Sequence, residues 1–273
     1  MGADADIALQ HLFRRCESQP ACQTAFPELR VGFSETLERL ELDPPRVRFR
    51  HPRTGEWQER ELDRGRFVAQ IRVLLYNREQ HRVLPWVLDQ AAAGGFEPFM
   101  ATATALEEAL VDAMTVGVTA NILCSEDVGR HGREAVPADE AGSFLGTLQA
   151  DFWLAVCEDW PRYSVPPDYD DPLRSAIPTL LISGELDPVT PPAYGEQLLA
   201  TLSNARHVIL PGGGHTDGFR GGHCINRIIN RFINEPDPQA LDTACVENLG
   251  PRPFFTRTTG FSVADKGQEQ HHD

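Results

Sequence analysis

Two side chains that could act together in acid–base catalysis, Asp187 and His215, each follow a short apolar run in the C-terminal third of the sequence. A carboxylate that accepts one imidazole N–H fixes the tautomer of the ring. It also stabilises the imidazolium that forms when the other nitrogen takes a proton. Each residue alone has an ordinary explanation, since Asp187 could cap the following helix and His215 could be a loop histidine. Their order, each just beyond an apolar run, favours an acid–base pair.

The two apolar runs cover residues 179–183 and 207–210, and apolar residues recur at every fourth position from Tyr194 between them. This spacing predicts a helix, so the segment reads as a strand–helix–strand unit with parallel strands. Catalytic groups in such units collect beyond the carboxyl ends of the strands. We therefore expect Asp187 and His215 to lie side by side, on strands that are apolar on both faces.

The strings GELDPVTPP at 184–192 and LPGGGH at 210–215 resemble the C-terminal part of the α/β-hydrolase fold. More narrowly, they are similar to the secreted tripeptidyl- and prolyl-aminopeptidase-like hydrolases of bacteria. The resemblance extends over the chain from about Ala3 to Thr256. In that fold the triad follows the chain order Ser, Asp, His. The resemblance implies a serine hydrolase that cleaves peptide or ester bonds through an acyl-enzyme, without a cofactor, with Asp187 as acid and His215 as base.

The nucleophile of such a triad is missing from this sequence. No G-x-S-x-G elbow occurs, and the nearest string, GSFLG at Gly142–Gly146, has its serine one place early. Ser125 could be proposed as a replacement, but no strand-to-helix elbow precedes it. We therefore expect the later half of a hydrolase whose serine comes from residues outside this chain. The alternative is a non-catalytic remnant or binding module.

The predicted fold class is α/β, with the C-terminal portion of an α/β-hydrolase sheet and a mostly helical cap domain. Residues 1–135 lack strand–helix alternation and predict helices with one β-hairpin, and the resembled family uses such a unit as its cap. Residues 136–256 are assigned to the hydrolase core. The polar tail at 257–273 is expected to be disordered.

Three local predictions concern the helical unit. Ser34 is expected to be an N-cap. Val47, Phe49 and Trp57 are expected on one face of the hairpin, and Pro85 is expected in the first turn of a helix. These positions are read from the sequence pattern alone.

Glu126 and Asp127 are candidates for binding the amino terminus of a peptide substrate. A desolvated carboxylate is a natural partner for an ammonium group, and the resembled family has acidic residues near this point. The alternative is that both are solvated acids at a helix start, where the dipole favours them. Both interpretations stay open.

The six cysteines predict disulfides. Sequence alone permits several pairings; the sequential one keeps each bridge within one structural unit, and the resemblance suggests the same. Disulfides belong to an oxidising compartment, so we expect a periplasmic or extracellular protein, although no export signal begins the sequence. The alternative is six buried thiols. The expected bridges are Cys16–Cys22, Cys124–Cys157 and Cys224–Cys245.

The formal net charge of −15 argues against nucleic acid and anionic membranes as partners. No apolar run approaches the length of about 18 residues that a membrane-spanning helix needs. The expected partners are a small peptide or ester substrate and either an N-terminal hydrolase half or a second copy of the chain. A metal set drawn from His215, Asp217 and His223 lacks helix spacing, so no metal is expected.

Overall fold

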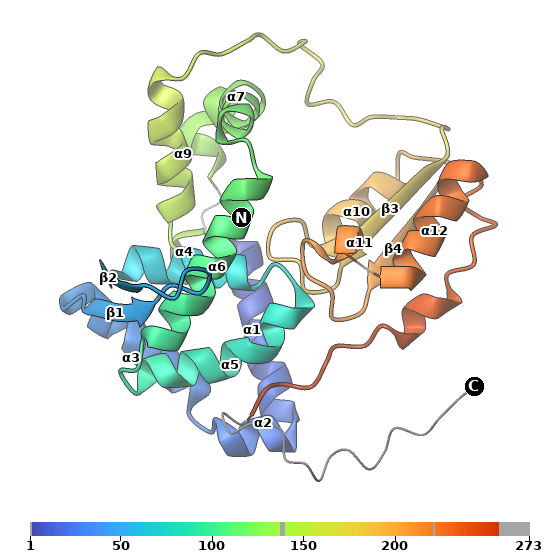
Figure 1. Ribbon diagram of the computed structural model, residues 1–273. Helices are drawn as coiled ribbons and strands as arrows, with labels where there is room; N and C mark the ends of the chain where they lie inside the picture. Colours follow the sequence, from blue (N-terminus) through green and yellow to red (C-terminus); the bar gives the residue numbers. More distant parts are fainter. Residues whose placement is uncertain (1, 137–139, 221, 257–273) are drawn as a thin grey trace, which may run out of the picture.

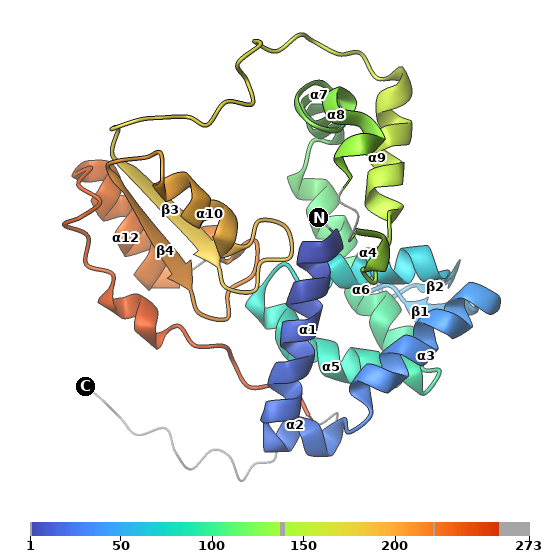
Figure 2. The same ribbon diagram turned by 180° about the vertical axis from the view of Figure 1, so that it is seen from behind.

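A helical part and a smaller α/β part lie side by side in the computed structural model, which describes residues 2–136, 140–220 and 222–256 (Figure 1). A long extended connection joins them along the outside of the molecule, as the reverse view also shows (Figure 2). None of the described helices is long and apolar enough to span a bilayer. The tail at 257–273, predicted to be disordered, lies outside the described residues.

The helical part surrounds a core of phenylalanine rings contributed by several helices. Phe67 packs on Phe99 with ring centroids 4.5 Å apart, and Phe33 contacts Phe13, Phe67 and Phe144. Burial of these large apolar side chains is the main favourable term for this part. Its elements are α1 (Gly2–Ser18), α2 (Pro20–Ala25), α3 (Leu29–Leu42), β1 (Arg46–Arg50), β2 (Trp57–Glu61), α4 (Arg64–Leu74), α5 (Arg78–Ala92), α6 (Glu97–Ala113), α7 (Val116–Glu126), α8 (Val128–His131) and α9 (Leu148–Asp159), with 3₁₀ turns at Gly132–Ala135 and Glu140–Gly142.

The α/β part is the predicted strand–helix–strand unit. Its two strands run parallel, so the prediction of parallel strands is confirmed. Val208 and Leu210 pack in one cluster with Ile225 and Ile228 of the last helix. The second strand of this unit also contacts the helix between the two strands. The elements are β3 (Thr179–Gly184), α10 (Pro192–Leu199), β4 (Ala205–Leu210), α11 (Asp217–Arg220), α12 (Gly222–Asn234) and a 3₁₀ turn at Ala244–Asn248.

Three local predictions are wrong, because the elements begin or pair at other residues than the pattern indicated. Ser34 lies inside α3, where its hydroxyl donates to Arg30 O. Trp57 pairs with Arg50 in the hairpin register, on the face opposite the buried Phe49, and is 48% exposed. Pro85 lies inside α5, because that helix already begins at Arg78.

Helical structure that packs on the first part continues beyond residue 135. Phe144 is buried in the helical core, and α9 packs against α7 and α8. Helical structure therefore continues to Asp159, beyond the predicted start of the core at residue 136. At the other end, Phe254 returns to the helical core and Phe255 N donates to Arg82 O at 2.8 Å.

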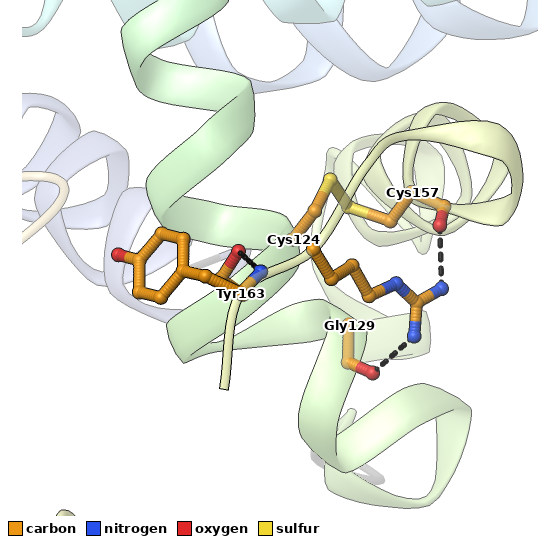
Figure 3. Close-up of a disulfide and its surroundings, with 6 residues drawn as sticks. Cys124, Gly129, Cys157 and Tyr163 are labelled. Carbon is orange, nitrogen blue, oxygen red and sulfur yellow. Dashed lines mark hydrogen bonds between the residues drawn. A yellow bond between two sulfur atoms is a disulfide. The ribbon is translucent and has the colours of Figure 1, made fainter. Parts of the chain in front are cut away.

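Each disulfide joins two cysteines of the same part of the molecule. The described chain contains the three sequential bridges, Cys16–Cys22, Cys124–Cys157 and Cys224–Cys245. Figure 3 shows the second, which joins α7 to α9. Beside it, Arg162 donates to the carbonyls of Gly129 and Cys157, so the start of the connection to β3 is held on the helices.

A buried histidine makes the stability of the helical part depend on pH. His81 is 1% exposed, and burial lowers its pKa to about 4, although its hydrogen bond to Leu75 O opposes this shift. As the pH falls below about 6.5, His81 of the unfolded chain binds a proton, whereas His81 of the folded chain does so only near pH 4. His81 contributes its full stability above about pH 6.5 and loses it as the pH falls toward 4, by up to about 3 kcal/mol.

We expect His81→Gln to be less stable than the wild type at pH 7, by a difference that shrinks as the pH falls toward 4. Urea unfolding at several pH values measures this difference. The exposed His11 is the matched control, and His11→Gln should leave the pH dependence unchanged. A His81→Gln deficit that is constant between pH 7 and pH 4 would contradict the prediction.

Candidate active site

Asp187 and His215 lie within hydrogen-bond distance beyond the carboxyl ends of β3 and β4. His215 Nδ1 is 2.9 Å from Asp187 Oδ2 and 3.1 Å from Oδ1. The strands bring them together because parallel strands end at the same edge of the sheet. Since an ionised carboxylate only accepts, Nδ1 carries a proton, and in the neutral ring Nε2 has the free lone pair.

The loop after β3 holds the Asp187 carboxylate. Backbone N–H groups of Val189 and Thr190 donate to Oδ1 at 2.8 and 2.9 Å, and the Thr190 hydroxyl donates to Oδ2 at 2.9 Å. Burial by itself would raise the pKa of Asp187. The hydrogen bonds from His215 and from these two N–H groups outweigh it, together with the charge of His215, so the pKa lies below its ordinary value. The carboxylate is therefore ionised at neutral pH.

The glycine-rich loop after β4 turns His215 back over the sheet. Gly212 has a φ of 63°, a conformation that favours glycine. The two loops are tied to each other, because Leu186 N donates to Gly213 O at 2.8 Å and Gly212 N donates to the Glu185 carboxylate at 2.7 Å. The histidine loop thus has a defined position relative to the acid.

A cavity of about 370 Å³ opens beside the pair. His215 is partly exposed, with a side-chain exposure of 33%, whereas the Asp187 side chain is 4% exposed. Within the part of the chain that the structure describes, no hydrogen bond is formed to His215 Nε2. A buried acid, an accessible base and an adjoining cavity are the arrangement that proton abstraction requires. The cavity is lined by Leu180, Ile182, Gly184, Asp187, Thr190, His215, Gly218 and Ile229.

The other acidic candidates lie elsewhere. The Glu126 carboxylate accepts hydrogen bonds from the hydroxyls of Tyr163 and Tyr169, which lower its pKa. Asp127 is exposed at the junction of α7 and α8. Neither lines the cavity beside His215, and their binding role stays a prediction.

Ser125 does not take part in the Asp187–His215 pair. It is 2% exposed, and its hydroxyl accepts from Tyr163 N at 3.2 Å. The alternative metal set of His215, Asp217 and His223 also finds no support, since the described residues contain no group of three or more ligands placed to hold an ion. Asp217 instead accepts hydrogen bonds from backbone N–H groups.

Sequence reasoning missed two residues at this site. Thr190 contacts both members of the pair, since its hydroxyl is 2.9 Å from Asp187 Oδ2 and 3.3 Å from His215 Nδ1. A threonine three positions after an acid is a turn signal that could have found it. Tyr76, whose ring centroid lies 5.2 Å from that of His215, comes from the helical part, so no local signal could have found it.

Part of the sequence is similar to a known protein family and to curated proteins. Residues 143–245 match the family model described as TAP-like protein. This part of the chain resembles the TAP-like α/β-hydrolases. The serine protease Hip1 of Mycobacterium tuberculosis and that of Mycobacterium bovis are each 32% identical over 110 residues, which is 39% of this chain. The matched region spans 20% of the length of these curated relatives. No solved structure matches the chain.

The Thr190 hydroxyl is expected to stabilise the folded protein through its hydrogen bond to Asp187. In Thr190→Val the buried Asp187 carboxylate loses one donor, so we expect a loss of about 2 kcal/mol in the free energy of unfolding at pH 7. The pKa of Asp187 lies below its ordinary 3.8, so its stabilising interactions are present at pH 7 and are lost as the pH falls below that value. Urea unfolding measures the change. Thr190→Ser, which keeps a hydroxyl, is the control, and equal stability of all three proteins would contradict the prediction.

Proposed function

We propose that this chain provides the acid and the base of a serine hydrolase that cleaves peptide or ester bonds through an acyl-enzyme. The observation that carries the proposal is the hydrogen bond between His215 Nδ1 and Asp187 at the ends of adjacent parallel strands. The match to the TAP-like family supports the same reaction class. The nucleophilic serine comes from outside this sequence.

The chemistry follows from the tautomer. With Nδ1–H donated to Asp187, His215 Nε2 removes the proton of an approaching serine hydroxyl as that oxygen attacks a carbonyl carbon. The ionised Asp187, held by the N–H groups of Val189 and Thr190, stabilises the imidazolium. Nε2 then gives its proton to the leaving amine or alcohol. A water molecule activated in the same way cleaves the acyl-enzyme.

The partner of this chain is a segment that carries a serine on a strand-to-helix elbow. The sequence contains no G-x-S-x-G, and β3 pairs with β4 in a two-stranded sheet. A further strand beside β3 would bring a serine elbow to the same edge of the sheet as His215. An uncovered strand edge also invites association, so a second copy of the chain is the other candidate partner.

The helical part is proposed as a cap, with Glu126 as the group that binds the amino terminus of a peptide. Hydrogen bonds from Tyr163 and Tyr169 lower the pKa of Glu126 and so favour the anion that an ammonium group needs. Asp127 is the second candidate. The three disulfides support a periplasmic or extracellular location, because such bridges persist in oxidising compartments.

The second candidate function is a non-catalytic remnant or binding module, which the missing serine elbow favours. The deciding experiment combines the chain with a companion polypeptide that carries the serine elbow. Hydrolysis of p-nitrophenyl esters and aminoacyl anilides is measured together with fluorophosphonate labelling and light scattering. The proposal predicts label on the companion only, and turnover only in the mixture.

The outcomes separate the candidates. A stable complex without turnover or label would favour the binding module. Label on this chain by itself would show that it holds its own nucleophile and would contradict the proposal. Self-association of the chain that the companion reverses would support a shared strand edge.

A further inference from the structure

The loop that carries His215 rests on the junction between α4 and α5, far away in the sequence. Thr216 N donates to Tyr76 O at 3.0 Å, and the Thr216 hydroxyl lies 3.3 Å from the same oxygen. On the other side of the histidine, Gly214 N donates to Asp217 Oδ2 at 2.7 Å. Both neighbours of His215 are therefore held by hydrogen bonds.

Asp217 connects this loop to the start of α5. The oxygen that accepts from Gly214 also accepts from Arg78 N at 3.0 Å, and Oδ1 lies 3.4 Å from Arg78 Nε. Arg78 is the first residue of α5, where the helix dipole favours a carboxylate. The Asp217 side chain is 8% exposed, so these contacts replace its lost hydration.

The junction leaves the histidine loop little freedom. A Cβ at Gly214 would lie 2.5 Å from Tyr76 O, so the backbones approach as closely as a glycine permits. The buried His81 donates to Leu75 O at 2.8 Å, next to Tyr76 in the chain. The Tyr76 ring lies edge-on to the imidazole of His215, with ring centroids 5.2 Å apart.

We propose that Asp217 is a positioning residue for His215. It fixes Gly214 and, through Arg78, ties the histidine loop to the helical part, so that Nδ1 stays directed at Asp187. The helical part thereby orients the base in addition to its proposed role as a cap. The positioning role of Asp217 rests on the proposed function, but its effect on the His215 imidazole can be measured without any turnover.

The test is the exchange of the His215 Nδ1–H with water, measured by side-chain ¹H–¹⁵N NMR of the full chain and assigned by its loss in His215→Gln. In Asp217→Ala the N–H groups of Gly214 and Arg78 lose their acceptor. Hydrogen bonds to a charged group are worth enough that we expect exchange to become about tenfold faster or the signal to disappear. Asp217→Asn keeps one acceptor oxygen and should show a smaller increase.

The experiment has two controls, a variant at a neighbouring acid and a reporter of folding. Glu79→Ala removes a neighbouring acid that is 51% exposed and bonded to Arg82 and Arg252 at the surface, and it should leave His215 unchanged. The His51 ring, 4% exposed and paired with Glu108, reports that the helical part is folded. If Asp217→Ala fails to fold, Asp217→Asn carries the test.

The possible failures are distinct. If the wild type shows a protected Nδ1–H that neither Asp217 variant changes while His51 stays intact, the positioning role is overturned and the proposed hydrolase is untouched. If the wild type shows no such signal, the acid–base pair is absent and both proposals are overturned. If the Asp217 variants expose Nδ1–H but the reassembled protein has no turnover, the positioning role stands and the proposed function is wrong.

Discussion

His215→Ala is expected to lower kcat about a million-fold in the enzyme that contains its serine, as loss of the base does in a serine protease triad. The reason is that no other described group lines the cavity with an accessible basic nitrogen. Binding of substrate depends on the cavity walls, so KM should change much less than kcat. Single-turnover hydrolysis of an aminoacyl anilide by the reassembled protein measures the loss.

The matched control is His11→Ala, since His11 is exposed on α1 and does not line the cavity beside His215. It should keep wild-type turnover. Fluorophosphonate labelling gives an independent reading, because the serine of the companion reacts only when His215 activates it. Normal turnover of His215→Ala would contradict the assignment of the base.

Asp187→Asn is expected to lower kcat about ten-thousand-fold. The amide oxygen would remain with the N–H groups of Val189 and Thr190, which now donate to Asp187 Oδ1. The amide nitrogen would then face His215 Nδ1 as a donor. Nδ1 would have to accept, the ring proton would move to Nε2, and the base would be lost although the geometry is kept.

The same NMR spectra test this reasoning before any turnover is measured. In Asp187→Asn the His215 ring should carry its proton on Nε2, whereas the wild type carries it on Nδ1. Asp237→Asn is the control, because Asp237 is exposed and its carboxylate accepts from Gln239 N in a turn. A kcat within tenfold of the wild type, about 1.4 kcal/mol or less, would show that Asp187 does not orient the base.

The helical part shows how far local pattern carries a prediction. The sequence pattern predicted helices and one β-hairpin before residue 135, and both are present, because an apolar helix face must be buried whatever it packs against. It misplaced Pro85, since the start of α5 is set by Asn77, whose side chain accepts from Gln80 N. It also misplaced Trp57, because cation–π contacts with Arg48 and Arg50 hold that ring on the exposed face of the hairpin.

The pairing of Asp187 with His215 followed from the sequence, because two apolar runs with a helix between them favour adjacent parallel strands, whose ends meet at one edge. Only the tertiary structure decided what holds the base. Tyr76, Arg78 and Asp217 meet through backbone groups and a buried carboxylate. Contacts of this kind leave no periodicity in the sequence, since a backbone N–H or C=O is the same at every residue other than proline.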